Sequence, residues 1–121
     1  MSENYRIEKI AGHEIQIRRS TGGVIELKAR NHLELSTALG FAHAQDRMTQ
    51  MALVRLAGQG RLSECLKHSE NTQEVDIFMR EMGFAREAKQ EVKTLSKEAR
   101  DSVQAYCDGV NHFFEHHSLP F

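Results

Sequence analysis

The sequence of 121 residues contains no tryptophan, and only 7% of its residues are aromatic. With so few large side chains, we expect the hydrophobic core to be thin for a chain of this length. The sequence also lacks an apolar run close to the roughly eighteen residues that a membrane-spanning helix needs, so we expect no membrane partner. Its start, MSENYRIEKI, has no apolar stretch typical of a secretory signal peptide.

An excess of one charge is absent as well. Sixteen Lys and Arg residues stand against seventeen Asp and Glu residues, which gives a formal net charge of -1. Nucleic-acid-binding proteins usually carry a marked basic excess, so we expect no nucleic-acid partner. A hydrophobic share of 40% and a charged share of 27% are typical of a globular protein. This length suits one domain, and we predict a single domain over residues 1–121.

Cysteine is scarce too, with Cys65 and Cys107 as the two examples. They allow one disulfide at most, and neither lies in a C-x-x-C motif. The sequence leaves open whether they pair. We interpret both as small core residues, because free cysteine is commonly buried as a small hydrophobe.

A β-hairpin is predicted over about residues 13–28. Ile15 and Ile17 alternate with polar residues, and Ile25 and Leu27 do so again after the Gly22-Gly23 step. A hairpin of two strands is marginally stable in water, so we expect this one to join a larger sheet or to lie on helices.

The rest of the chain has the pattern of helices. Asn31 and Glu34 have the spacing of an N-cap and a third helical position, and apolar residues follow at three-and-four spacing as far as Leu56. A second helix is predicted from a cap at Asn71 with Glu74 to about Leu95. A third is predicted from Ser96 to Pro120, with the stripe Ala99, Val103, Tyr106, Val110 and Phe113. The predicted class is α+β, mostly α, with a hairpin followed by about three helices in a helical part over about residues 32–117.

Several histidines could bind a metal ion. His112 and His116 are spaced to share one helix face and could fill two corners of a zinc site, with Glu115 and His117 nearby and a third ligand from Cys107 or His43. Cys65 and His68 have a similar spacing. The alternative is a solvated helix end, where the helix dipole favours histidine. We favour this alternative and assign no metal ligand.

Candidates for catalysis are few. His43 and Asp46 could form an oriented general base, but no nucleophile accompanies them in the sequence, and a structural ion pair is the favoured interpretation. An N-terminal Ser2 could act as a nucleophile after removal of Met1, although its surroundings are those of an ordinary chain start. Gly58-Gln59-Gly60 lacks the rest of a dinucleotide-binding fingerprint. We therefore assign no catalytic and no cofactor-binding residue.

A series of short motifs has an order and spacing that resembles the N-terminal part of the α chain in the penicillin acylase (penicillin amidase) family of N-terminal-nucleophile hydrolases. The hairpin with Gly23-Val24 fits the start of that chain, and the resemblance covers about residues 12–121. The motifs that carry it are, in chain order, Ala38–Arg47 (ALGFAHAQDR), Gln50-Met51 with Arg55, Gly60–Glu64 (GRLSE), Asp76 with Arg80 and Gly83, Ala105–Asn111 (AYCDGVN) and Leu119-Pro120. Departures from the pattern are Ile25 where the family has proline, Thr49 where an aromatic residue is common, and Cys107 where alanine is usual.

The resemblance implies a fragment of a larger N-terminal-nucleophile hydrolase fold. Such a precursor cleaves itself, and the new N-terminal Ser of its β chain attacks an amide of a β-lactam or an N-acyl homoserine lactone. The family's catalytic, acyl-pocket and calcium-binding residues fall outside this sequence. The resemblance therefore implies an inactive portion with no cofactor of its own, while the full-length parent is an enzyme in which calcium is allowed.

The partners implied are the remainder of the α chain, the β chain of the same precursor and a small-molecule amide substrate of the full enzyme. The family points to a periplasmic or secreted location, although no signal peptide is visible. Apolar stripes that would pack on the β chain should make the isolated chain self-associate. The alternative from a different class is a stand-alone helical protein-interaction module without enzymatic activity.

Overall fold

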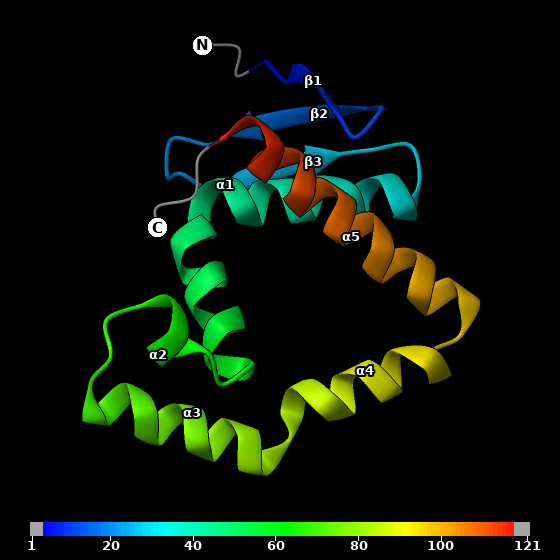
Figure 1. Ribbon diagram of the computed structural model, residues 1–121. Coiled ribbons are helices and arrows are strands. Elements are labelled where there is room, and N and C mark those ends of the chain that lie inside the picture. Colours follow the sequence, from blue (N-terminus) through cyan, green and yellow to red (C-terminus); the bar gives the residue numbers. More distant parts are fainter. Residues whose placement is uncertain (1–3, 118–121) are drawn as a thin grey trace. The chain divides into compact units, whose positions relative to one another are not determined.

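A computed structural model describes residues 4–117 (Figure 1). They fall into two compact units, and each is described by itself. The sheet unit comprises the residues up to Arg47 together with those from Lys97 onward, and the helical unit comprises Met48–Ser96. The predicted α+β, mostly helical class is confirmed. The single domain over residues 1–121 stays a prediction, and Ser2 and Leu119-Pro120 lie outside the described residues.

The sheet unit holds three antiparallel strands in the order β1-β2-β3. They are β1 (Arg6–Ile10), β2 (His13–Arg19) and β3 (Ile25–Lys28). The predicted hairpin over residues 13–28 corresponds to β2 and β3, and it does join a larger sheet. The strand β1 was not predicted, because the two isoleucines of RIEKI do not alternate with polar residues in the period of a strand.

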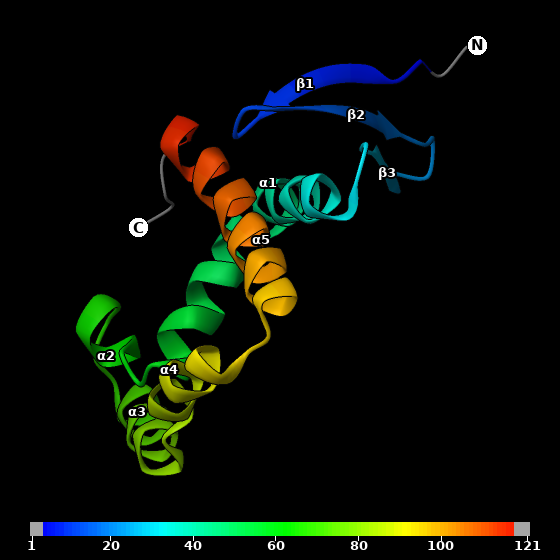
Figure 2. The ribbon, with the colours of Figure 1, turned by 90° about the vertical axis from the view of Figure 1, so that its right-hand side faces the viewer.

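One face of the sheet is buried. Ile10, Ile15 and Ile17 are at most 3% exposed, whereas Gln16, between the last two, is exposed. In both views the sheet lies above the first half of α1 (Figures 1 and 2). The strand period thus decides which side chains reach the core.

Helix α1 (His32–Gly58) is interrupted at Arg47, where φ is -137° and ψ is 29°. Its first part begins as predicted, because Asn31 Oδ1 accepts a hydrogen bond from the backbone N–H of Glu34 at 3.0 Å. Apart from Glu34, the side chains that it buries are mostly small, namely Thr37, Ala38, Phe41, Ala42 and Ala44. The predicted apolar residues Leu35 and Leu39 are each 42% exposed, so the buried stripe is narrower than the sequence pattern indicates.

Helix α5 (Lys97–His116) packs on the first part of α1 in the sheet unit. Backbone meets backbone there, since a Cβ atom on Gly109 would lie 2.9 Å from the backbone nitrogen of Phe41. The rings of Phe41 and Phe113 pack edge to face with centroids 5.7 Å apart.

The helical unit contains the second part of α1, α2 (Leu62–Cys65), α3 (Glu70–Met82) and α4 (Phe84–Thr94). The prediction of one helix from residue 71 to about 95 is wrong, because Gly83 has a φ of 73° and separates α3 from α4. The predicted cap at Asn71 is wrong as well. Ser69 caps α3 instead, and its Oγ accepts a hydrogen bond from the N–H of Thr72.

The core is thin, as the composition indicates. All eight buried hydrophobic residues belong to the sheet unit, and no apolar side chain is buried anywhere in the fully described stretch 48–96. Large apolar side chains of the helical unit at least 48% exposed are Val54, Ile77, Phe78, Met82, Phe84 and Val92. Among the described residues, no helix is long and apolar enough to cross a bilayer.

Candidate functional site

The pair His43 and Asp46 does not form a general base in the sheet unit. Asp46 pairs with the guanidinium of Arg19 from β2, and His43 Nδ1 lies 2.9 Å from the hydroxyl of Tyr106 in α5. Burial raises the pKa of the Tyr106 hydroxyl, and the neighbouring Cys107 adds to this effect. Both polar side chains of the pair therefore tie α1 to other elements, which is a structural role.

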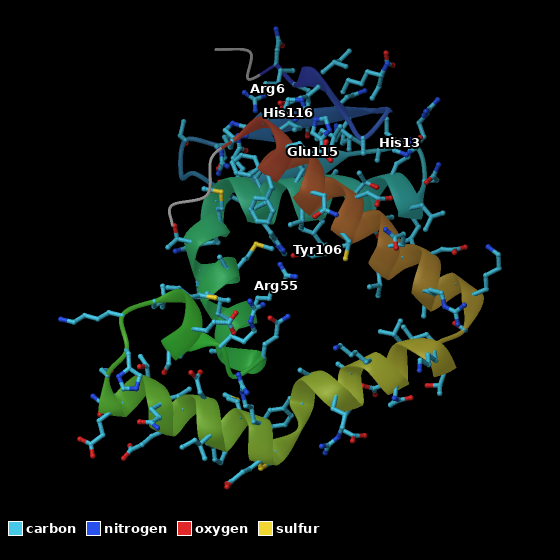
Figure 3. The ribbon with its side chains drawn as sticks, in the orientation of Figure 1. Arg6, His13, Arg55, Tyr106, Glu115 and His116 are labelled. Atoms are coloured by element: carbon cyan, nitrogen blue, oxygen red, sulfur yellow. The ribbon has the colours of Figure 1, made fainter. Side chains whose placement is uncertain are left out.

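The histidines at the end of α5 do form a cluster. One ligand atom each from His112, Glu115 and His116 lies within 4.8 Å of the others. Figure 3 labels Glu115 and His116 at the end of α5. Neither Cys107 nor His43, the further ligands considered from the sequence, belongs to it. His117 stacks on Phe113 with ring centroids 3.9 Å apart.

Hydrogen bonds restrict what this cluster can bind. The backbone N–H of Ala11 donates to His112 Nδ1 at 3.2 Å, so the neutral ring carries its proton on Nε2 and has no lone pair left for a metal ion. His116 Nδ1 lies 2.7 Å from the carbonyl oxygen of His112 and donates to it, which leaves its Nε2 available. Two available ligands, from His116 and Glu115, are fewer than the three or four that a zinc site uses.

The cysteines are placed differently from the prediction. Cys65 at the end of α2 and Cys107 in α5 are both free and exposed, so their interpretation as core residues is wrong. Cys65 and His68 belong to no cluster of three ligands among the described residues.

A carboxylate clamp holds the turn that carries the GRLSE motif in the helical unit. Asp76 of α3 is 8% exposed, and its two oxygens accept hydrogen bonds at 2.8 Å from the backbone N–H groups of Leu62 and Ser63. Burial raises the pKa of the Asp76 carboxyl, but the N–H groups of Ser63 and Leu62 outweigh burial, and the pKa is lowered overall. Arg80 Nε donates to the carbonyl oxygen of Gly60 at 2.9 Å.

This clamp is the feature that the sequence did not reveal. The sequence contains Asp76 and Arg80 four positions apart on one helix, but this spacing is also typical of an ion pair on a solvent-exposed helix surface. The structure shows instead that both side chains reach a turn earlier in the chain. The clamp therefore binds backbone groups of this turn.

A second buried carboxylate, Glu34 in the first turn of α1, has the same character. It accepts hydrogen bonds from the guanidinium of Arg30 at 2.8 Å and from the backbone N–H of the same residue at 3.1 Å. The Arg30 guanidinium is the main reason that the pKa of the Glu34 carboxyl is lowered. His13 Nδ1 lies 3.4 Å from Glu34 Oε1, the oxygen that accepts the 2.8 Å hydrogen bond from Arg30.

A cleft of about 550 Å³ in the sheet unit is lined by Arg6, Arg18 and Arg19. Each arginine pairs with a carboxylate, namely Glu8, Glu26 and Asp46 respectively. These pairs compensate the positive charge, so the cleft does not have the character of an anion site.

The described residues have an α+β structure in which buried carboxylates bind backbone N–H groups and the backbones of α1 and α5 lie in close contact. A family model described as "Penicillin amidase" matches residues 14–121. The chain belongs to the penicillin amidase family.

Relatives with known names agree. The chain is 36% identical over 99 residues to the penicillin acylase 2 proenzyme of Pseudomonas sp. (strain SE83), which covers 82% of this chain and 12% of that protein. It is 32% identical over 97 residues to the acyl-homoserine lactone acylase QuiP of Pseudomonas aeruginosa, which covers 80% of this chain and 11% of that protein. The chain thus spans 11–12% of the length of these curated relatives.

A solved structure is similar as well. A thermostable penicillin G acylase from Alcaligenes faecalis superposes with a TM-score of 0.74 and 28% identity, over 84% of this chain and 53% of that chain. The family resemblance seen in the motifs is therefore confirmed.

Proposed function

We propose that this chain is a non-catalytic, N-terminal portion of an amide hydrolase. The complete protein would cleave side-chain amides of β-lactam or N-acyl homoserine lactone type. The family match over residues 14–121 is the observation that carries this proposal. Relatives named as a penicillin acylase and as an acyl-homoserine lactone acylase support both substrate types.

The reacting groups would lie in the rest of the polypeptide. After self-processing of a precursor, a new N-terminal Ser would attack the amide carbonyl carbon, with its own α-amine as the base and neighbouring donors at the developing oxyanion. The side chains described here suit a supporting role. Asp76, Arg80 and Glu34 each spend their hydrogen bonds on backbone groups or an ion pair within the chain.

Calcium in the complete protein would be held elsewhere. Calcium takes six to eight oxygen ligands, whereas the cluster of ligand-type side chains found among residues 4–117 offers two histidines and a single carboxylate. This cluster therefore does not fit a calcium ion.

The partners proposed for this chain are the remainder of the α chain and the β chain of the same precursor. The relatives are about eight times as long as the matched region, as the 12% coverage indicates. The exposed apolar side chains of the helical unit supply surface on which the additional polypeptide can pack.

The experiment that tests the function uses the product of the complete reading frame. We expect two co-purifying chains, the second beginning with Ser, Thr or Cys, and hydrolysis of a β-lactam side-chain amide or an N-acyl homoserine lactone. A single product of 13.8 kDa without amidase activity would contradict the proposal. That outcome would favour the alternative, a stand-alone helical interaction module.

A further inference from the structure

The helical unit contains an open groove of about 720 Å³ between the end of α1, the turn that follows it and α4. Phe84, Ala88 and Val92 of α4 form its apolar wall, and Phe84 and Val92 are 50% and 48% exposed. An apolar hollow of this kind on a unit without one buried apolar side chain is typical of a surface that another segment covers.

Positive charge surrounds this apolar wall. Arg55, Arg61 and Lys89 line the groove, and the described residues of the lining include no Asp or Glu. Glu64 already compensates Arg61 through hydrogen bonds of 2.8 and 3.0 Å. The side chains of Arg55 and Lys89 make no hydrogen bond or ion pair among residues 4–117, and Figure 3 shows Arg55 projecting from the later turns of α1. Two cations beside the apolar wall are thus left for an occupant.

We propose that this groove, lined by Arg55, Phe84, Ala88, Lys89 and Val92, is the docking site for an apolar segment bearing Asp or Glu from the remainder of the same acylase polypeptide. The inference rests on the proposed function, which requires that further polypeptide. The length of the relatives supplies it, since the matched region is 12% of the penicillin acylase 2 proenzyme.

Charge argues against a second copy of this chain as the occupant. In a two-fold dimer the same patch faces itself, so Arg55 and Lys89 would approach the partner's identical cations. Like charges brought together across an interface cost free energy. A segment with carboxylates next to apolar residues satisfies both halves of the groove.

Thiol labelling of the complete protein tests whether the groove is covered. In a C65S/C107S background, Ala88→Cys places the probe in the groove, and Gln90→Cys places a control on the same helix outside the lining. We expect a thiol-reactive maleimide to label Ala88→Cys at least about tenfold more slowly than the same variant unfolded in guanidinium. Labelling of the folded Ala88→Cys protein at the unfolded rate would overturn the proposal.

Charge reversal tests the chemistry of the occupant. Adding Lys89→Glu to the Ala88→Cys protein should raise its labelling rate about tenfold, because the acidic segment is repelled. Loss of a neighbouring cation by itself slows thiol reactions, so an increase cannot come from that effect. Arg86→Glu on the same helix, whose side chain pairs with Glu87 outside the groove, is the matched control. Equal labelling rates for the two reversals would overturn an acidic occupant.

The remaining outcomes are separable. Protection of Ala88→Cys that appears only as the protein concentration rises would assign the groove to a second copy and would contradict the proposal. Failure of the proposed function is measured independently, through the intact mass and the amidase activity of the complete protein. An active, two-chain enzyme in which Ala88→Cys is labelled at the unfolded rate would contradict this inference and would still support the proposed function.

Discussion

A Cβ atom on Gly40 in α1 would overlap the carbonyl oxygen of Tyr106 in α5, and it would lie 2.9 Å from the carbonyl carbon of the same residue. Gly109 makes the reciprocal approach from α5, since its Cβ atom would lie 2.8 Å from the carbonyl carbon of Thr37. Both obstacles are helix backbone, which cannot swing aside as the end of a side chain can. The sheet unit therefore depends on glycine at this crossing of two helices.

Gly40→Ala should destabilise the sheet unit. The new methyl group forces the two helices apart in a packed interior, and overpacking of this kind costs about 1–3 kcal/mol or more. Thermal unfolding of the variant and the parent protein measures the difference. Because the crossing consists of backbone contacts, we expect a lower midpoint temperature of unfolding, even though alanine has a higher helix propensity than glycine.

Gly58→Ala near the end of the same helix is the control, because a Cβ atom there would have no atom within 4 Å. The same substitution should then be neutral or should stabilise by up to about 1 kcal/mol. If both variants unfolded at the same temperature, the close approach at Gly40 would not limit stability.

Asp76→Asn should weaken the acid sensitivity of the helical unit. The pKa of the Asp76 carboxyl is lower in the folded protein than in the unfolded chain, so its ionised form stabilises the fold above about pH 4. That stabilisation disappears as the pH falls through the folded-state pKa. The asparagine variant cannot ionise, so its free energy of unfolding should be lower at pH 7 and should depend less on pH below about 4.

Chemical unfolding at a series of pH values measures this dependence. Glu74→Gln is the control on the same helix, since Glu74 is exposed. If the free energy of unfolding of Asp76→Asn fell with pH below about 4 as steeply as that of the parent, the hydrogen bonds from Leu62 and Ser63 would not stabilise the ionised carboxylate in solution.

Local patterns predicted much of the fold from the sequence. The alternation of Ile15 and Ile17 gave the correct strand face, and the spacing of Asn31 and Glu34 gave the correct start of α1. These features depend on residues within a few positions of each other. The break at Gly83 was missed because the apolar spacing continues across it, and only the backbone shows the left-handed φ of 73°.

The tertiary features were not accessible to such patterns. Leu35 and Leu39 fit an apolar helical stripe, yet they are exposed, because the sheet and α5 cover the alanine side of α1 instead. The clamp from Asp76 to Leu62 joins residues fourteen positions apart. Ala11 and His112 are 101 positions apart and come together only through the fold of the sheet unit. Family motifs filled part of this gap, since their order predicted which residues belong to one architecture.

His112→Ala should loosen the turn between β1 and β2. The backbone N–H of Ala11 donates to His112 Nδ1, and without the ring this amide loses its acceptor. We expect the exchange of the Ala11 amide hydrogen to accelerate severalfold, as followed by NMR or mass spectrometry. His116→Ala leaves this hydrogen bond in place, and the exchange at Ala11 should not change. Zinc that slowed the exchange at Ala11 in the parent would contradict the assignment of the His112 proton to Nε2, because metal binding and the hydrogen bond would then compete for the lone pair on Nδ1.

The isolated 121-residue chain should self-associate. Phe78 and Met82 lie one helical turn apart on α3, and they are 54% and 50% exposed. Together they form an apolar surface in contact with water, which favours association. Sedimentation velocity over a range of concentrations should show a dimer or a larger species. Phe78→Ser should shift the distribution toward the monomer, whereas Glu81→Ser on the same helix should not, because it removes no apolar surface. A compact monomer of the parent chain at high concentration would show that this surface is too small to drive association, and the exposure of α3 would then not require a partner.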